Sequence, residues 1–325
     1  MMNRYAELLF WAGRYMERVG NYARLIDVNY HMRHELYGHQ DREYIWERLA
    51  GTTGNVRRFE ELYDHMNAGT NELTALHFLT FEHSNNNSIL ACVRQARNNI
   101  RTLRQLVPVE LWEIMNAFYI WLKDQNVGQL MLQSPHLFYQ KVREWATLFG
   151  GAVDAVMIRG QEWEFLQAGK YVERVDNTLR IIYAVHRQLD RAPAVESHSY
   201  SCQRTVVLLK SLGGFEPFRR LHTADVTFEK AMEFMLTNGY FPHSARHALN
   251  AVEGHIERLH LQAGDKAAMM EAVSRLSDTV QSIAASAADG ERAVTEADLS
   301  RLLRASGQLG QAAAAAFLSD CNVGA

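Results

Sequence analysis

Two segments far apart in the chain carry the same ionisable side chains at the same spacing. Residues 13–26 read GRYMERVGNYARLI, and residues 169–182 read GKYVERVDNTLRII. At an offset of 156 residues, eight of these fourteen positions are identical, and Lys170 keeps the positive charge of Arg14. Chance does not produce this agreement, so the sequence contains an internal repeat of a segment rich in Glu, Arg and Asn.

The spacing places the polar residues of each copy on one face of a helix. Because an α-helix turns by about 100° per residue, the repeated polar side chains share an arc of roughly 120°. These side chains are Arg14, Glu17, Arg18, Asn21 and Arg24 in the first copy, and Lys170, Glu173, Arg174, Asn177 and Arg180 in the second. Most apolar residues of both copies fall on the opposite arc. The sequence therefore predicts two long helices, antiparallel or crossed, with the same polar face.

Three roles are open to this polar face. A solvated face, held by charge pairs four residues apart, contributes only a few tenths of a kcal/mol and has little reason to recur with the same spacing. The two faces can instead pack across a pseudo-twofold axis, so that Glu17 meets Arg174 and Glu173 meets Arg18 in a buried network. They can also line a pocket in which guanidinium and carboxamide groups hold an anionic or peptide-like ligand. The network and the pocket stay equally open, and both can hold.

A second basic segment could belong to the same pocket. Arg94, Arg97, Arg101 and Arg104 recur at three- and four-residue spacing, so a helix aligns them in one stripe. A solvated stripe is one interpretation, and a third wall of the polar cavity is the other. Arg97 and Arg101 also fall in a stretch of the family pattern that the chain resembles, described below, and with the polar residues of the repeat they complete the set that we predict to bind a ligand.

Signals of catalysis are nearly absent from the sequence. It has no Walker loop, no glycine-rich dinucleotide loop, no Gly-x-Ser-x-Gly and no His-Glu-x-x-His. Glu17 and Glu173 could act as general bases, but neighbouring arginines lower the pKa of a glutamate and make it a poor proton acceptor at neutral pH. Cys92 and Cys202 have no motif-adjacent histidine to activate them. No catalytic residue is assigned, and the pattern favours binding over catalysis.

Two histidine pairs have the spacing of metal ligands. His243 and His247 are four residues apart on a predicted helix, and His31 and His34 are three residues apart. Such pairs bind zinc only where acidic partners converge on them. The chain has 14 histidines, so these spacings arise readily by chance. We therefore expect neither a metal nor another cofactor.

Helical periodicity dominates the elements that must position these residues. No strand-like alternation is bounded by turn residues, so we predict an all-α fold, a multi-helix bundle around the two Glu-Arg helices. Helices are expected near residues 3–36, 41–50, 55–68, 71–81, 86–105, 109–123, 136–158, 161–190, 197–212, 225–237, 243–262, 265–287 and 295–318. Prolines mark several of the expected ends, at Pro108, Pro135, Pro193, Pro217 and Pro242.

Composition restricts the protein class and the partners. Of the 325 residues, 47% are hydrophobic and 22% are charged, which is typical of a globular protein. A net charge of −3 argues against nucleic acid as the main partner. The chain has no signal-peptide pattern, no apolar run of about 18 residues and only three scattered cysteines, so we expect a cytoplasmic protein without a membrane segment. Residues 263–325 are rich in Ala. We expect a helical domain over 1–262 and an Ala-rich helical extension, packed on it, over 263–325.

The repeat resembles the two signature helices of the bacterial alpha-E domain family. The segments AELLFWAGRYMER at 6–18 and GKYVERVDNTLR at 169–180 carry this resemblance. Three further stretches agree with the family pattern: NSI at 87–89 with ARNNIR at 96–101, LWEIMN at 111–116, and FPHS at 241–244. The resemblance covers roughly residues 3–260 and implies an all-helical protein whose biochemical role is unassigned.

The resemblance also implies partners. The family is typically encoded beside a circularly permuted ATP-grasp protein and a transglutaminase-like protein, which implies a role in making or modifying a peptide or amide-linked metabolite. Two functions follow as expectations: a binding or assembly subunit that works with the ATP-grasp ligase, or an enzyme that uses the polar cavity directly. The chain departs from the family pattern at Asn98, Val156, Asn238 and His243, where Glu, Thr, Asp and Arg are usual.

Overall fold

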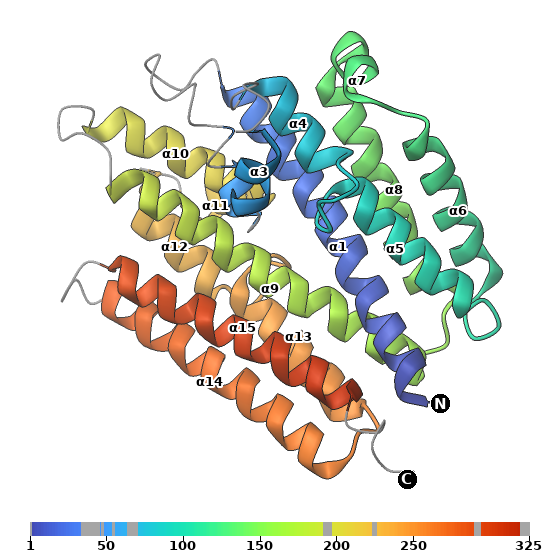
Figure 1. Ribbon diagram of the computed structural model, residues 1–325. Helices are drawn as coiled ribbons and strands as arrows, with labels where there is room; N and C mark the ends of the chain where they lie inside the picture. The colour runs from blue at the N-terminus through green and yellow to red at the C-terminus, as the bar shows by residue number, and fades with distance from the viewer. Residues whose placement is uncertain are drawn as a thin grey trace.

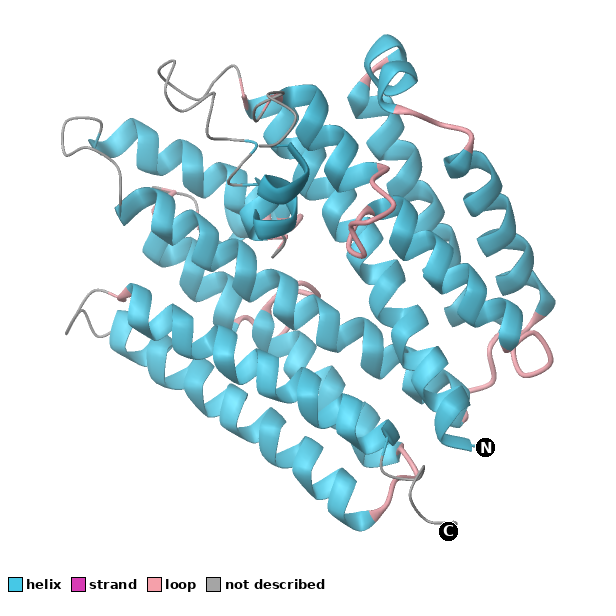
Figure 2. Cartoon of the chain, in the orientation of Figure 1, coloured by secondary structure: helices cyan, strands magenta, loops and turns pink. Residues whose placement is uncertain are grey.

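The protein is all-α in the computed structural model, which describes residues 2–33, 46, 49–53, 56–63, 71–190, 197–222, 226–288 and 294–318. No strand occurs among these residues (Figure 2), so the predicted fold class is confirmed for them. The helices are α1 (Met2–Met32), α3 (Val56–Tyr63), α4 (Glu72–Thr80), α5 (Ile89–Thr102), α6 (Val109–Lys123), α7 (Val127–Gln133), α8 (Pro135–Val156), α9 (Gln161–Asp190), α10 (Ser197–Ser211), α11 (Phe215–Leu221), α12 (Phe228–Thr237), α13 (Ala245–Arg258), α14 (Ala263–Ala288) and α15 (Glu296–Leu318).

The long helices α1 and α9 pack against each other at the centre of the molecule (Figure 1). Each carries a glycine where the two backbones come closest. A Cβ atom on Gly13 would lie 2.0 Å from the backbone oxygen of Leu166, and a Cβ atom on Gly169 would lie 2.0 Å from that of Phe10. Because no real Cβ atom fits at this distance, both positions require glycine. The two helices start at the same end of the molecule and diverge, so they are crossed and not antiparallel (Figure 1).

The remaining helices form two groups around this central pair (Figure 1). On one side, α5 and α8 pack against α1, and α6 packs against both of them. On the other side, α13 packs against α9, and α12 and α14 pack against α13. Helices α10 and α15 contact both α1 and α9. Nearly all buried apolar side chains of the described residues belong to one cluster, which includes residues of α1, α9 and both groups.

Local hydrogen bonds fix the turn between α12 and α13, which matters for the site. Asn238 Oδ1 accepts hydrogen bonds from the backbone N–H groups of Tyr240 and Phe241, at 2.9 and 2.8 Å. Ser244 is the N-cap of α13, and its Oγ accepts a hydrogen bond from the backbone N–H of His247 at 3.1 Å. The Ser244 hydroxyl also donates to the backbone oxygen of Asn238. These contacts hold the intervening segment, which contains His243, in one conformation.

The predicted helices agree with the structure to within a few residues at most ends, with two omissions. Helices α6 and α9 have the predicted bounds, 109–123 and 161–190. The predicted helix at 41–50 lies mostly outside the described residues. Helix α7 was not predicted because it has seven residues, too few for an apolar period, although Asn126 caps it. Helix α11 was not predicted because Gly213, Gly214 and Pro217 suggest a turn, yet Pro217 fits in the first turn of a helix.

The C-terminal part packs on the body as a helical hairpin. Helices α14 and α15 lie side by side and antiparallel (Figure 1), and they contact α12, α13, α9 and α1. The packing predicted for the Ala-rich segment is thus confirmed over its described residues, 263–288 and 294–318. The division into two domains at residue 262 stays a prediction. None of the described helices has the length and apolar character needed to span a lipid bilayer.

Candidate ligand-binding site

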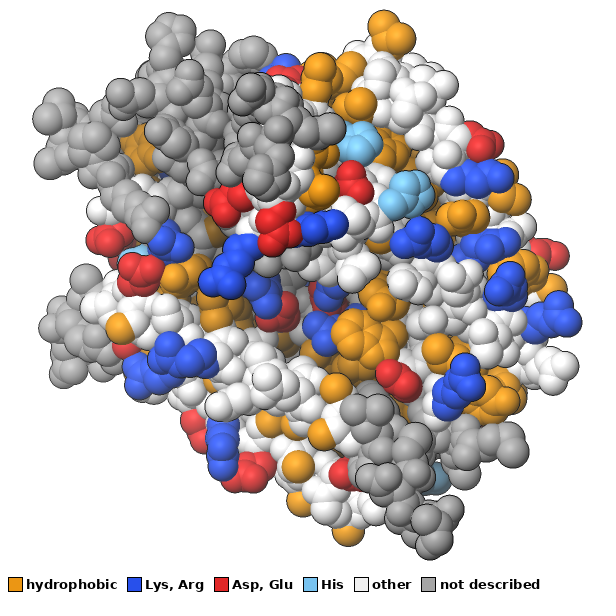
Figure 3. Space-filling view, viewed as in Figure 1, with side chains coloured by type: hydrophobic (Ala, Val, Ile, Leu, Met, Phe, Trp, Pro, Cys, Tyr) orange, Lys and Arg blue, Asp and Glu red, His pale blue; other side chains and the backbone are white. Residues whose placement is uncertain are grey.

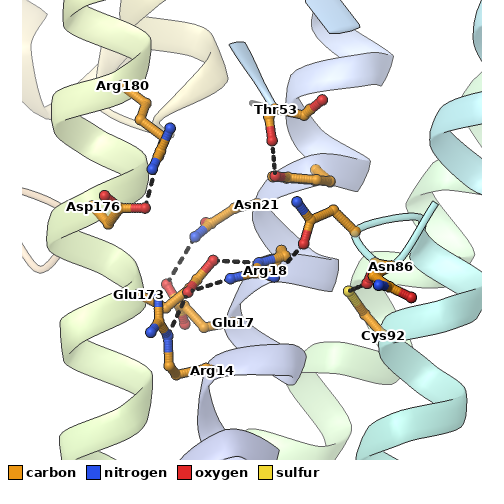
Figure 4. Close-up of polar contacts among 12 residues, drawn as sticks. Arg14, Glu17, Arg18, Asn21, Thr53, Asn86, Cys92, Glu173, Asp176 and Arg180 are labelled. Atoms are coloured by element: carbon orange, nitrogen blue, oxygen red, sulfur yellow. Dashed lines mark hydrogen bonds and ion pairs between the residues drawn. The ribbon is translucent and has the colours of Figure 1, made fainter. Parts of the chain in front are cut away.

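The Glu-Arg residues of α1 and α9 form two reciprocal ion pairs between the helices, Glu17 with Arg174 and Glu173 with Arg18. Figure 4 shows the second of these pairs. Arg174 donates from Nε and Nη2 to the two carboxylate oxygens of Glu17, at 2.7 and 2.9 Å. Arg18 donates from Nε and Nη2 to the two carboxylate oxygens of Glu173, at 2.5 and 2.9 Å. All four side chains are buried, with 4 to 11% of their surface exposed. Such two-point contacts fix both the distance and the orientation of the charged groups.

Neighbouring polar groups complete each ion pair. Arg14 donates from Nε to Glu173 at 2.8 Å and lies over the ring of Trp11. Arg18 also donates from Nη1 to the Asn87 side chain at 2.6 Å. On the other pair, Asn21 Nδ2 donates to Glu17 at 3.3 Å, and Arg174 Nη1 donates to the backbone oxygen of Pro242 at 3.3 Å. The pairs are therefore parts of a hydrogen-bonded network and not isolated contacts.

The ion pairs keep both glutamates ionised. Burial by itself raises the pKa of Glu17, but the charge and hydrogen bonds of Arg174 outweigh it and lower the pKa to about 2. Burial also opposes ionisation of Glu173, and Arg18 and Arg14 lower its pKa to about 2 as well. A carboxylate with this pKa accepts a proton poorly at neutral pH. Neither glutamate is suited to act as a general base.

A cavity of about 280 Å³ lies beside the Glu17–Arg174 pair, between α1, α8 and α9. Its ionisable lining residues are Glu17, Arg24, Arg143, Lys170, Arg174 and His243. Apolar side chains and glycines make up much of the remaining wall, including Gly20, Gly150 and Phe149. The lining therefore holds four cationic side chains and one carboxylate, which makes the cavity electropositive.

A smaller cavity of about 130 Å³ lies beside the Arg18–Glu173 pair. Its charged lining residues are Arg18, Glu173, Asp176 and Arg180. Arg180 donates from Nε to Asp176 at 2.7 Å, so each arginine of this cavity has its own carboxylate. Figure 3 shows acidic and basic side chains close together near the middle of the face in view. The smaller cavity is polar but electrically balanced.

Residues 1–318 match the model of a family described as a predicted alpha-helical domain with a conserved ER motif, Alpha-E. This chain has Glu-Arg pairs at Glu17–Arg18 and Glu173–Arg174, the four residues that form the reciprocal ion pairs. The chain belongs to the Alpha-E family. Neither the curated proteins nor the solved structures contain a match to it. The family match extends beyond residue 260 and includes α14 and α15.

The structure of this Alpha-E protein brings together the polar residues of the repeat but not the whole predicted set. Every residue of the repeat set lines one of the two cavities or, like Arg14, contacts a residue that does. Arg97 and Arg101 line neither cavity, so the predicted third wall is wrong. Arg97 donates to the Asn116 side chain on α6 at 2.9 and 2.8 Å and lies near the rings of Trp112 and Tyr119. Arg101 is exposed.

Helix packing explains why the basic stripe of α5, which contains Arg97 and Arg101, does not line the polar cavity. Helix α5 packs against α1 with its apolar face and against α6 on the other side. The stripe therefore faces away from the α1–α9 contact. Arg143 takes the expected place instead: it lines the larger cavity from α8 and donates to Asp27 Oδ2 at 2.6 Å. No spacing pattern points to Arg143, because it is the only cationic residue of α8 in the lining of that cavity.

The four positions at which the resemblance implies a departure from the family pattern separate into two groups. Asn98 and Val156 line neither cavity. His243 lines the larger cavity, and Asn238 holds the turn that carries it. Burial lowers the pKa of His243, and the positive charge of Arg174 lowers it further, to about 3. The imidazole is therefore neutral at physiological pH and a weak base.

The remaining nucleophile and metal candidates, Cys92, Cys202, His31 and His247, line neither cavity. Burial raises the pKa of Cys92 to about 11, which keeps its thiol protonated. His34 lies outside the described residues, but His31 lies near Asp27 and His136, and one ligand atom from each lies within 4.8 Å of the others. Arg143 already binds the Asp27 carboxylate. The carboxylate of Asp27 therefore has Arg143 as a partner as well as the two neighbouring histidines.

Proposed function

We propose that the protein is a binding and assembly subunit that acts with a circularly permuted ATP-grasp ligase. In this proposal the ligase makes or modifies a peptide or amide-linked metabolite, and the Alpha-E protein holds an anionic part of the reactant or product. A transglutaminase-like protein is the expected second partner. The ligand occupies the polar region between α1 and α9, beside the Glu-Arg pairs.

The observation that carries this proposal is the state of the two glutamates. Glu17 and Glu173 are each bound by arginine at two points and have pKa values of about 2. Groups held in this way position their partners but do not exchange protons during a reaction. The arrangement supports the binding of charged groups in a fixed geometry, and these two glutamates give no support to the enzymatic alternative.

We infer that the reciprocal pairs are also the reason for the internal repeat. Each copy supplies one glutamate and one arginine, and each glutamate binds the arginine of the other copy. The contact between α1 and α9 therefore requires the same adjacent Glu and Arg in both copies. The polar faces of α1 and α9 are equivalent and meet where the two helices cross. Such a subunit is suited to hold a ligand in a fixed position relative to a partner protein.

Reconstitution with the ligase encoded beside the protein tests the proposal. The ligase, the Alpha-E protein and their mixture are each incubated with ATP and a small-molecule extract of the source cells. We expect the two proteins to co-purify, and ADP release and a new amide product in mass spectra to require both of them. Product formed by the Alpha-E protein alone, or equally by the ligase alone, would contradict the proposal.

A further inference from the structure

The two cavities are lined by equivalent positions of the two repeats. The larger cavity has Glu17, Gly20, Asn21 and Arg24 of α1 with Arg174 of α9. The smaller cavity has Glu173, Asp176, Asn177 and Arg180 of α9 with Arg18 of α1. Each residue of the first set is 156 positions from its counterpart in the second. One difference in charge separates the two sets: Gly20 occupies the position of Asp176.

This difference decides whether an arginine is neutralised. In the smaller cavity, Asp176 accepts a hydrogen bond from Arg180 Nε at 2.7 Å. In the larger cavity, Gly20 has no side chain, and Arg24 makes no ion pair or side-chain hydrogen bond with any described residue. The absence of the carboxylate therefore leaves the guanidinium of Arg24 available to a ligand.

A second pair of equivalent residues, Arg14 and Lys170, also differs in whether the cationic side chain has a carboxylate partner. Arg14 donates to Glu173 and adds a second cation to that carboxylate. Its counterpart Lys170 lines the larger cavity and forms no ion pair within the described part of the chain. Arg24 and Lys170 are both partly buried. Two cationic groups that form no ion pair with a described residue thus face one cavity.

The surroundings of these two groups disfavour an empty cavity. Burial lowers the pKa of Arg24, and the charges of Arg143 and Arg174 lower it further. Burial and the charge of Arg174 also lower the pKa of Lys170. A concentration of like charge in a partly enclosed space is relieved when an anion enters. The volume of about 280 Å³ limits that anion to a small molecule or a terminal group.

We propose that the larger cavity binds a small dianion, a phosphate monoester or a dicarboxylate, through its cationic residues Arg24 and Lys170. Its ligand is the anionic reactant or product of the proposed function, on which this inference rests. The planar guanidinium of Arg24 is suited to a two-point contact with ligand oxygens, and the ammonium of Lys170 adds a second positive charge to the cavity wall. The smaller cavity binds no such ligand because its arginines, Arg180 and Arg18, are already ion-paired with Asp176 and Glu173.

Anion titration of the purified protein tests the assignment. Inorganic phosphate and glutarate are each titrated by calorimetry at constant ionic strength, with chloride as the balancing ion. We expect one site for at least one of these anions, and the stronger binder identifies the ligand as phosphate-like or carboxylate-like. Arg24→Gln is expected to weaken binding by at least about tenfold, since one charged hydrogen-bond partner contributes that much or more.

Two matched variants make the test specific. Gly20→Asp supplies the carboxylate of the other repeat and is expected to abolish binding; a Cβ at this position meets only Ala146 Cβ, at 3.5 Å, so the helix accommodates it. Arg180→Gln removes the same charge from the equivalent position of the smaller cavity and is expected to leave the affinity unchanged. Thermal unfolding without anion verifies that the variants are folded.

The outcomes separate this inference from the proposed function. No binding of either anion to the wild type, or equal loss in Arg24→Gln and Arg180→Gln, would overturn the assignment of the larger cavity. That result would not contradict the prediction that the ligase requires the Alpha-E protein to form product. If the protein bound the anion but the ligase formed product without it, the assignment of the larger cavity would be supported and the assembly role would be contradicted.

Discussion

At the scale of single residues, the Glu17–Arg174 pair couples α1 to α9 by a buried two-point contact. Glu17→Gln leaves the Arg174 charge buried without a carboxylate, and we expect it to lower the free energy of unfolding by about 3 kcal/mol. The double variant Glu17→Arg with Arg174→Glu restores opposite charges. We expect it to lose less stability than the sum of its two single changes, as measured by urea unfolding.

A surface pair provides the control for this cycle. Arg275 and Glu271 form an exposed ion pair four residues apart on α14, with more than 60% of both side chains exposed. Arg275→Gln should cost less than about 1 kcal/mol, because solvent screens an exposed pair. Strict additivity in the Glu17 and Arg174 cycle would show that the two charges act independently.

His243 gives the stability of the fold an acid-sensitive component. Its pKa is about 3 in the folded protein and 6.5 when it is free of the fold. Between these values the unfolded state binds a proton that the folded state excludes, so stability falls as the pH decreases below 6.5. The charged groups that act on this imidazole are Arg174, Glu17, Arg24 and Lys170.

We therefore expect His243→Gln to reduce the pH dependence of stability. The wild type should lose up to about 1.4 kcal/mol per pH unit through this group between pH 6 and pH 5, where Glu17 and Glu173 are still ionised. Urea unfolding at several pH values measures the slopes. Equal slopes for the wild type and His243→Gln would contradict the assignment of this histidine. Below about pH 4.5, both proteins should lose stability as Glu17 and Glu173 are protonated on unfolding.

The reciprocal pairs were predictable from the sequence, but the surroundings of the larger cavity were not. The repeat places Glu17 and Arg18 at the positions of Glu173 and Arg174, and a symmetric contact between equal faces requires cross-pairing. Arg143 comes from another helix and has no counterpart in the repeat. Contacts between helices that share no sequence pattern depend on packing, which a single sequence does not specify.

At the scale of helices, Gly13 and Gly169 permit the close approach of α1 and α9. Gly169→Ala places a Cβ against the backbone of Phe10, which cannot rotate away as a side chain can. The helices must then separate, and we expect a loss of about 3 kcal/mol in the free energy of unfolding. Gly150→Ala is the matched control, because nothing lies within 4 Å of its Cβ position. It should be neutral or stabilising, since Ala favours a helix over Gly; a similar loss in both variants would contradict the close-approach explanation.

Helix prediction succeeded where an apolar period was long and failed where an element was short. Helix α9 shows its period over 30 residues, and its bounds followed from the sequence. Helix α7 has seven residues, of which only Leu130 is buried, so its formation depends on its cap and on packing against α4 and α8. Local pattern specifies long amphipathic helices, whereas short connecting helices are specified by their neighbours.

At the scale of the whole molecule, the C-terminal hairpin is continuous with the core. Buried apolar residues of α14 and α15, such as Leu276 and Leu302, belong to the same cluster as those of α1 and α9. Polar contacts also connect the two parts: Ser306 Oγ donates to Asp176 at 3.2 Å, and Tyr183 donates to Glu296 at 2.9 Å. The hairpin therefore supports the charged centre as well as the apolar core.

We expect the full chain to unfold in one cooperative transition, and a variant ending at residue 262 to be markedly less stable. Removal of the hairpin exposes apolar surface on α9, α12 and α13 to water, and each Å² of this surface costs about 25 cal/mol. It also removes Ser306 from Asp176, whose carboxylate neutralises Arg180. Calorimetry and urea unfolding of both proteins measure the difference. If the shortened protein retained the unfolding temperature of the full chain, residues 1–262 would be an independent domain, and the hairpin would be an addition without a role in holding the Glu-Arg pairs together.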